Sequence, residues 1–537
     1  RNTSRSSAMN YREYPDGPLL AYDTGAGMNQ LDEVVQTRNY YSANVYANYD
    51  ETFGEAHHVS ATAGFNYETW SSKNVSVAGI NLSSINLDDL NLATGSPTEG
   101  AYGGGQNEYA LAGFFARINY DYKGRYLFEV SGRYDGSSRF APGNRWGLFP
   151  SASAGWRISE EPFFGNAKDL VDNLKLRASF GSLGNQNVSS YYTYMRLITN
   201  KDFSNYTFDG SIKGKYSSLG APVASDLTWE TAQQWDLGLD LTMLNNRLNF
   251  TGDVYIRDTK GILGKGKSLP SIYGANEPQV NSNNLRTKGY ELVLGWRDSF
   301  KLAGSTFSYG ITGTFSDYTA EYTKCDNPSG LIGGPYVGKK DGEIWGYKVD
   351  GLCRNDEEAA EYASRVDLSK VAAGYYSATG AYGKGVRGGD IKYLDLNGDG
   401  VINGNDMKPM FWNGQPKMTF GITLYASWKG LDFNMLWSGA AKYTAKYNEV
   451  LGNVLALDSS NSPAFYYDRW HLADVYDPNS AWIPGKYPAT RRTDADNGAN
   501  RLESNMQRIN AAHARLKNLE LGYTLPAKLL RGSGISK

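Results

Sequence analysis

The segment at positions 123–158 constrains the fold most, because its apolar residues recur at every second position. Even positions from 126 to 134 and from 146 to 158 are mostly apolar or small, and the odd positions between them are mostly polar. A period of two predicts β-strands with one apolar and one polar face. Two such strands of about ten residues, with aromatic residues near their ends, match the wall of a membrane-spanning β-barrel. A water-soluble sandwich alternates in the same way, so this segment alone leaves both folds open.

The same alternation recurs along the chain and predicts about thirteen strands. They fall at 41–49, 59–67, 112–120, 126–134, 146–158, 174–180, 235–243, 248–256, 290–296, 307–315, 420–428, 431–437 and 519–525. Short turns such as Lys123-Gly124 and Lys429-Gly430 alternate with long polar connections. Turns at one end of the strands and loops at the other are typical of outer-membrane barrels. We therefore expect an all-β fold, a transmembrane antiparallel β-barrel with long extracellular loops.

Composition excludes several other classes of protein. The mean hydropathy is -0.51, and no apolar run approaches the roughly 18 residues of a membrane-spanning helix. Lys and Arg number 54 against 56 Asp and Glu, which leaves no basic surface for nucleic acid. The sequence contains no GxSxG, HExxH or GxxxxGK[ST] motif, and no pair of carboxylates stands out as an acid and base. We therefore do not expect an enzyme.

Five segments resemble the barrel of the SusC/RagA-type TonB-dependent transporters of Bacteroidetes. They are GRYDGSSRFAPGNRWGLFPSASAGWRIS at 132–159, LKLRASFGSLGNQ at 174–186, LTWETAQQWDLGLDLTMLNNRLNFTGDVYIRDTKGIL at 227–263, GGDIKYLDLNGDGVINGND at 388–406 and RLKNLELGYTLP at 515–526. The resemblance extends from Tyr40 onward, with the motifs in the family's order.

The resemblance implies a barrel of 22 strands in the bacterial outer membrane, surrounded by lipid and large enough to hold a plug. It also implies TonB-energised import of oligosaccharides or oligopeptides, with a SusD-like surface lipoprotein as a lid. Residues 1–537 would then be the C-terminal barrel portion, and we expect the plug domain, the terminal strands and the N-terminal region that contacts TonB to lie outside this sequence. A non-transporting surface receptor or assembly scaffold on the same barrel remains open, as does a passive porin.

The motif DLNGDGVINGND in the longest predicted loop is a candidate calcium site. Its spacing matches positions 1, 3, 5, 7 and 12 of a calcium loop. The candidate ligands in that order are Asp395, Asn397, Asp399, Val401 through its carbonyl, and Asp406. The aspartate at position 12 is shorter than the usual glutamate, and a metal-free turn rich in Asn, Asp and Gly is the alternative. Calcium here would be structural, fixing an extracellular loop.

The two cysteines, Cys325 and Cys353, lie in the same predicted loop. This loop is on the side of the membrane where disulfides persist, so the pair is a candidate disulfide. The sequence does not give the distance between them, and two unpaired thiols are the alternative.

Aromatic residues in the predicted loops are candidates for contact with a substrate or a lid, because their rings stack on sugars and pack against peptides. The alternative is that they hold the loops together. These residues are Trp70, Trp345, Tyr347, Phe411, Trp412, Trp470 and Trp482. Charges on the polar strand faces should point into the lumen, where they line a path or pair across strands. They include Arg117, Asp121, Glu129, Arg133, Asp236, Asp240, Asp253 and Arg257.

Overall fold

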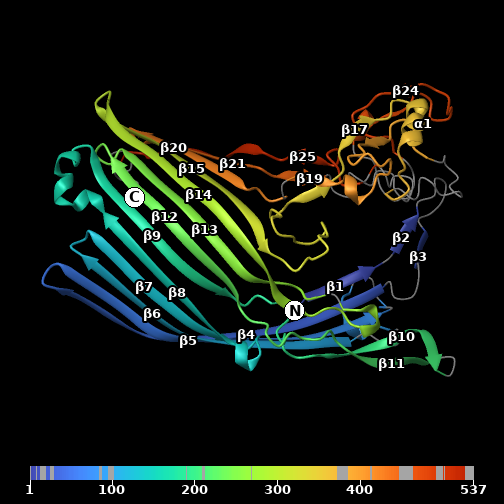
Figure 1. The fold of residues 1–537 in the computed structure, drawn as a ribbon, viewed down its shortest axis with the longest axis horizontal. Coiled ribbons are helices and arrows are strands. Elements are labelled where there is room, and N and C mark those ends of the chain that lie inside the picture. The colour runs from blue at the N-terminus through green and yellow to red at the C-terminus, as the bar shows by residue number, and fades with distance from the viewer. Residues whose placement is uncertain are drawn as a thin grey trace. The chain divides into compact units, whose positions relative to one another are not determined.

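One sheet of fourteen strands dominates the computed structural model (Figure 1). The structure describes residues 2–7, 9–12, 20–23, 29–80, 82–83, 87–94, 102–188, 190–208, 212–267, 269–371, 385–411, 414–446, 464–490, 500 and 502–526. In their order across the sheet the strands are β1 (Asn2–Ser7), β4 (Asn29–Phe53), β5 (His57–Ile80), β6 (Tyr102–Tyr122), β7 (Tyr126–Ser137), β8 (Trp146–Arg157), β9 (Val171–Asn185), β12 (Glu230–Met243), β13 (Leu248–Lys265), β14 (Gln279–Leu302), β15 (Ser305–Lys324), β20 (Met418–Trp428), β21 (Leu431–Ala441) and β26 (His513–Tyr523).

Each of the thirteen strands predicted from the alternation is confirmed as a strand of this sheet. The fourteenth, β1, has the sequence NTSRSS, which carries no apolar alternation, and it pairs with β4. The predicted strands were also too short, since β4 and β5 contain 25 and 24 residues. Trp70 was therefore wrongly placed in a loop: it lies within β5, opposite Tyr40 and Tyr109.

The tight turns of the sheet have the backbone geometry that two-residue hairpins require. Lys123 and Gly124 have φ of 53° and 64°, and Lys429 and Gly430 have φ of 49° and 83°. Two successive positive φ angles twist the chain in the sense that matches the flanking strands. Because most strands pair with their neighbours in sequence, successive connections fall at opposite ends of the strands. The short turns and the long loops are therefore separated, as the sequence predicts.

The chain divides into two compact units. Unit 1 comprises Arg1–Trp156, Arg177–Trp235 and Asp258–Asn284, and unit 2 comprises Arg157–Leu176, Asp236–Arg257 and Leu285–Lys537. In unit 1, the apolar strand residues Val45 and Leu148 are 72% and 67% exposed, and in unit 2 Leu521 is 80% exposed. An extended apolar face that the described chain leaves uncovered requires an apolar surrounding such as a bilayer. Among the described residues, none of the helices is long and apolar enough to cross a membrane.

The remaining strands are short and pair two by two. In unit 1 they are β2 (Met9–Arg12) with β3 (Leu20–Asp23), and β10 (Ile198–Phe208) with β11 (Ile212–Leu219). In unit 2 they are β16 (Ile344–Gly346) with β19 (Lys408–Phe411), β17 (Val349–Leu352) with β18 (Ile391–Tyr393), β22 (Thr444–Lys446) with β25 (Arg508–Asn510), and β23 (His471–Leu472) with β24 (Trp482–Ile483). The helices are α1 (Asp356–Arg365) and the short 3-10 turns Leu90–Leu92, Pro142–Asn144, Ile158–Glu160, Pro162–Ala167, Ser271–Tyr273, Gly404–Asp406 and Ala464–Asp468.

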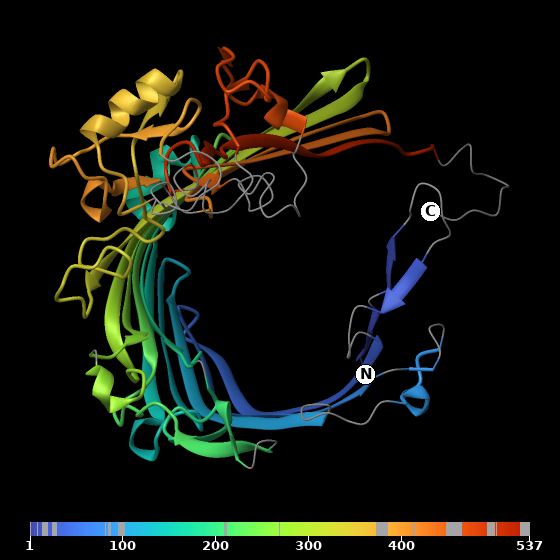
Figure 2. The same ribbon diagram turned by 90° about the vertical axis from the view of Figure 1, so that its right-hand side faces the viewer.

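The described residues of the connections 325–417 and 442–512 of unit 2 form a loop domain with a core of its own. Helix α1, yellow in Figure 2, is capped at its N-terminus by Asn355, whose side chain accepts the N–H of Glu358 at 2.9 Å. Its fully buried Ala359 packs in one core with Ile391 and Tyr393 of β18. The described part of the longest loop is thus a folded element, because it buries apolar side chains in a core of its own.

Candidate functional site

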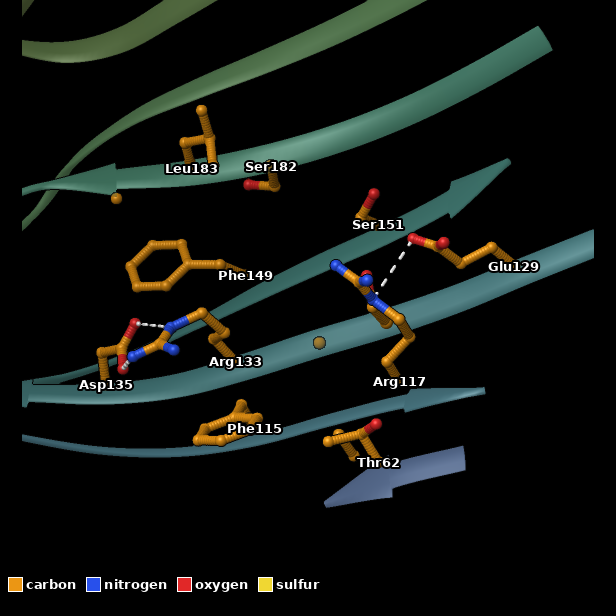
Figure 3. Close-up of a pocket in the computed structure, with 14 residues that line it drawn as sticks. Thr62, Phe115, Arg117, Glu129, Arg133, Asp135, Phe149, Ser151, Ser182 and Leu183 are labelled. Carbon is orange, nitrogen blue, oxygen red and sulfur yellow. Dashed lines mark hydrogen bonds and ion pairs between the residues drawn. The ribbon is translucent and has the colours of Figure 1, made fainter. Parts of the chain in front are cut away.

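A cavity of about 570 Å³, the wall pocket, lies in unit 1 on the polar faces of five neighbouring strands, β5 to β9 (Figure 3). Its volume falls in the range of about 300–1,000 Å³ that small-molecule sites occupy. Alternation places large side chains from every second position on this face. The residues that give it its chemistry are Phe115, Arg117, Glu129, Arg133, Asp135 and Phe149.

Two ion pairs line the wall pocket. The Nε and Nη2 atoms of Arg133 donate to the two carboxylate oxygens of Asp135 at 3.0 and 2.8 Å, which makes the pair bidentate. Nε of Arg117 in β6 lies 3.7 Å from the carboxylate of Glu129 in β7. The second pair is longer and more exposed, and contributes little to stability. The pairing across strands that the sequence left as an alternative is therefore found for Arg117 and Glu129, whereas Arg133 and Asp135 pair along the same strand β7.

Glycines of the neighbouring strands make room for the large side chains of the pocket. A Cβ atom at Gly113 would lie 2.0 Å from Oδ1 of Asp135, and one at Gly184 would lie 2.0 Å from Cζ of Phe149. The ring of Phe115 lies opposite Arg133 in the register, with the guanidinium 5.5 Å from its centre. Phe115 and Phe149 are pocket residues that were not predicted, although an aromatic residue at a polar-face position of a strand is a usable signal in the sequence.

An aromatic cluster on the same unit holds the connection between β9 and β12 against the sheet. Trp70 and Tyr109 are register partners, and both stack on Tyr191, with ring centres 5.3 and 6.1 Å away. The guanidinium of Arg139 lies 4.3 Å from the ring of Tyr109 and 4.9 Å from that of Tyr191. The backbone carbonyl of Arg139 also accepts the hydroxyl of Thr193 at 2.6 Å. Trp70 therefore packs with the wall and anchors a loop.

A buried aromatic group of three residues, Phe140, Phe149 and Trp229, shares Phe149 with the wall pocket. Phe140 and Trp229 pack with ring centres 5.4 Å apart, and Phe149 meets Trp229 at 5.3 Å. Trp229 donates its indole N–H to the carbonyl of Arg145 at 2.8 Å. Phe149 is only 7% exposed. The packing of Phe149 against Trp229 therefore holds this side chain of the wall pocket in place.

The other predicted contact aromatics lie in the loop domain. Tyr347 is 6% exposed and belongs to its core, and Trp345 donates its indole N–H to Glu343 at 2.8 Å. Trp470 donates to the carbonyl of Arg354 at 3.2 Å, and Trp482 lies against Gly388. Phe411 ends β19, and Trp412 lies outside the described residues. The structure thus places these side chains within the domain, and their contact with a substrate or lid stays a prediction.

The predicted calcium loop is shaped by its own hydrogen bonds. The carboxylate of Asp395 accepts the N–H groups of Gly400 and Gly398, both at 2.7 Å. These hydrogen bonds lower the pKa of the Asp395 carboxyl, and the bond from Gly400 contributes most. Asn397 accepts the N–H of Asp399 at 3.0 Å, and Asp399 accepts that of Val401 at 2.8 Å. Side-chain oxygens at positions 1, 3 and 5 are therefore all fixed by the turn.

Position 12 of the same motif is fully buried. The carboxylate of Asp406 accepts the N–H of Leu396 at 2.9 Å and that of Asn403 at 2.8 Å. Among the described residues, His, Cys, Asp and Glu side chains form no group of three placed to hold a metal ion. Calcium binding stays a prediction.

Both cysteines are free thiols in the structure. Cys353 is fully buried in the core of the loop domain, and burial, followed by the neighbouring carboxylate of Asp390, raises the pKa of its thiol to about 12. Burial also raises the pKa of the half-buried Cys325. The two thiols are therefore unpaired in this structure, and a raised pKa lowers the fraction of each thiol that is present as the reactive thiolate.

The family model for the β-barrel of TonB-dependent receptor-like proteins matches residues 2–525. The chain belongs to this family. It is a family of the bacterial outer membrane and of receptors rather than enzymes, so the predicted fold class and location are confirmed. The apolar outer face and the polar face with the wall pocket are the two surfaces of such a barrel.

Curated relatives of this receptor barrel come from Bacteroidetes. TonB-dependent receptor P26 of Formosa agariphila is 27% identical over 99% of the chain and 50% of its own length. TonB-dependent receptor SusC of Bacteroides thetaiotaomicron is 30% identical over 60% of the chain and 30% of its own length. The chain thus spans about half the length of the curated relatives that it matches across most of its residues.

Solved structures show the same fold. The RagAB peptide transporter covers 94% of the chain with a TM-score of 0.71 at 21% identity, and the RagAB peptide importer in its open-open state covers 99% with a TM-score of 0.74 at 20% identity. The chain covers 51% and 52% of those two chains. The predicted SusC/RagA-type resemblance is confirmed for the barrel.

Proposed function

We propose that this chain is the barrel portion of an energised outer-membrane importer of the SusC/RagA type. The family match over residues 2–525 carries the proposal. The barrel supplies an apolar outer wall for the bilayer and a polar inner wall with a cavity, and the long loops form the extracellular surface. Its cargo is an oligosaccharide or an oligopeptide.

The importer works with partners outside this chain. A SusD-like lipoprotein covers the extracellular loops, and TonB engages a region that precedes the barrel in the full-length protein. A plug domain in the lumen closes the pore until TonB acts. The likeness to the RagAB peptide transporter supports a partnered assembly.

The calcium prediction belongs to this proposal. A structural calcium ion would be held by Asp395, Asn397, Asp399, the carbonyl of Val401 and Asp406. The Asx-type hydrogen bonds that already turn this loop support the assignment. The ion would stiffen the loop domain and take no part in transport itself.

The test compares uptake in the intact organism with and without each component. Deleting the full-length gene, or removing TonB, should abolish growth on the oligomeric nutrient while growth on its monomer stays normal. Uptake that persists without TonB would indicate a passive porin. Normal uptake in the gene deletion, together with loss of a surface assembly, would indicate the scaffold.

A further inference from the structure

The apolar outer face of unit 2 ends at a pair of aromatic rings on the side of the long loops. Tyr290 of β14 and Phe315 of β15 stack with ring centres 5.9 Å apart, and Tyr290 is 38% exposed. They continue a row of exposed apolar side chains on the same strand faces, which includes Leu292, Leu294 and Ile311. Aromatic rings at the end of such a face mark the border between hydrocarbon and lipid headgroups. Side chains beyond them on this face therefore lie at the depth of the headgroups.

Charged side chains replace the apolar ones immediately beyond this border. Lys288 and Asp317 each lie two residues further along the same faces of β14 and β15, away from the tight turn at 303–304. Lys442 directly follows β21, reaches across β20, and pairs through its ammonium group with Oδ2 of Asp317 (Figure 1). Lys288 is exposed, and the side chain of Lys442 is about half exposed. Two ammonium groups thus lie at the headgroup level beside one carboxylate.

Asp317 carries the observation that points to a ligand. The residue is only 8% exposed, and in the described part of the chain its buried Oδ1 atom has no hydrogen-bond partner. A carboxylate oxygen that is removed from water and left without a donor is costly. A ligand that donates a hydrogen bond to Oδ1 offsets this cost. The same ligand meets an excess of positive charge, because Lys288 and Lys442 stand beside a single carboxylate.

We propose that Lys288, Asp317 and Lys442 form a lipid-border site, which binds the headgroup of an outer-leaflet lipid. This headgroup carries a phosphate and a neighbouring N–H or O–H group. The phosphate accepts hydrogen bonds from the two ammonium groups, and the N–H or O–H group donates to Oδ1 of Asp317. The acyl chains lie along the apolar face beside Tyr290 and Phe315. The inference goes beyond import and depends on neither the cargo nor TonB.

The experiment titrates lipids into the purified full-length protein, with any lipoprotein that co-purifies, and counts the bound molecules by native mass spectrometry. Phosphatidylethanolamine and monophosphoryl lipid A carry both a phosphate and a hydrogen-bond donor. Phosphatidylcholine lacks the donor in its headgroup, and a galactosyl diacylglycerol lacks the phosphate. The first two should bind at least about tenfold more tightly than the last two. Equal affinity for all four lipids would indicate an unspecific lipid coat and overturn the proposal.

Phosphoethanolamine without acyl chains separates a lipid site from a site for a free anion. It should not displace phosphatidylethanolamine at equal concentration, because it lacks the chains that pack on the apolar face. Displacement at equal concentration would overturn the assignment to a lipid.

Two substitutions test the two halves of the lipid-border site. Lys288→Gln should weaken the binding of phosphatidylethanolamine about fivefold, as expected for one lysine at a lipid surface. Asp317→Asn should lower the preference for phosphatidylethanolamine over phosphatidylcholine at least about threefold, because a hydrogen bond to a charged oxygen becomes one to a neutral oxygen. Binding of phosphatidylcholine should not fall, because Lys442 keeps its charge. An equal loss for both lipids in Asp317→Asn would overturn the role of Oδ1.

Lys348→Gln is the matched control. It removes the same charge from an exposed residue between β16 and β17 of the loop domain, and should change the affinity less than about twofold. Lys288 has no side-chain partner within the described residues, so Lys288→Gln leaves the fold undisturbed, and heat-modifiable electrophoretic mobility checks this for every variant. Unchanged affinity in Lys288→Gln, or an equal loss in Lys348→Gln, would overturn the site.

Discussion

The hydroxyl of Tyr362 satisfies both backbone groups of Tyr393: it accepts the N–H at 2.8 Å and donates to the carbonyl at 2.9 Å. Tyr362 lies on α1 and Tyr393 ends β18, and they are 5% and 1% exposed. One side chain therefore joins the helix of the loop domain to its small sheet.

Tyr362→Phe should loosen the loop domain without disturbing the fourteen-stranded sheet. Removing the hydroxyl breaks two buried hydrogen bonds, which costs about 1–3 kcal/mol, so amide hydrogen exchange at Tyr393 should speed up roughly 5- to 150-fold. Mass spectrometry of peptides from 385–400 measures this change, and peptides from β7 serve as the control. Unchanged exchange at Tyr393 would show that the bond does not hold the two elements together.

Glu358 makes the loop domain sensitive to acid. Its carboxylate accepts a hydrogen bond from Lys392 at 2.7 Å. This bond contributes most to lowering the pKa of Glu358 to about 2, and the hydrogen bonds from Arg354 contribute as well. Because the folded pKa lies below the unfolded one, the stabilisation is complete above about pH 4.5 and is lost as the pH falls toward 2. Limited proteolysis of the loop domain should accelerate across this window.

Glu358→Gln is the control for that pH dependence. The variant should be cut faster than the wild type at pH 7 and should show a shallower change between pH 4.5 and 2. Some slope should remain, because the pKa of Asp395 is also lowered. An identical slope in variant and wild type would assign the acid response to other carboxyls.

Gly184 and Gly132 both border the wall pocket but should respond differently to a methyl group. A Cβ at Gly184 would lie 2.0 Å from Cζ of Phe149, whereas the nearest atom to one at Gly132 is 4.0 Å away. Phe149 packs against Trp229 and has little room to move. Gly184→Ala should destabilise the folded barrel by about 1–3 kcal/mol, and Gly132→Ala should be nearly neutral. Urea unfolding followed by tryptophan fluorescence tests the pair; equal stability of the two variants would contradict the packing argument.

Calcium should protect the loop domain if the predicted ligands bind it. Removing calcium with a chelator should increase proteolysis near residues 395–406, and adding it back should restore protection. Asp399→Asn should lose most of this response, because it removes a charged ligand at position 5 of the motif. If protection from proteolysis is the same with chelator and with calcium, the motif is a metal-free turn.

The two cysteines should react only slowly with a thiol reagent in the native protein. The pKa of the Cys353 thiol is raised to about 12, and the half-buried Cys325 should react first because it is more exposed. After unfolding without a reductant, both should be labelled, as counted by mass spectrometry. Failure of both to label until a reductant is added would establish the disulfide that the sequence suggested.

Local periodicity was sufficient to locate the sheet. A strand with one face in lipid and one in the lumen must alternate, so thirteen of the fourteen strands could be found from single stretches of sequence. Turn glycines such as Gly124 and Gly430 marked the hairpins, because the turn demands positive φ. The exception was β1, whose NTSRSS sequence carries no alternation and whose assignment rests on its pairing with β4.

Only the tertiary structure decided which residues of the polar face come together at the wall pocket. Thr62 and Ser182 meet at one cavity because strand register brings five strands together, and no local pattern encodes register between distant segments. In the same way, the position of Trp70 depends on residues far away in the chain: it pairs with Tyr109 in the sheet and stacks on Tyr191. The sequence by itself determined the strands, the membrane-facing surface and the family, since these depend on residues near one another in the chain. The wall pocket and the core of the loop domain depend on contacts between residues far apart in sequence, which only the folded chain specifies.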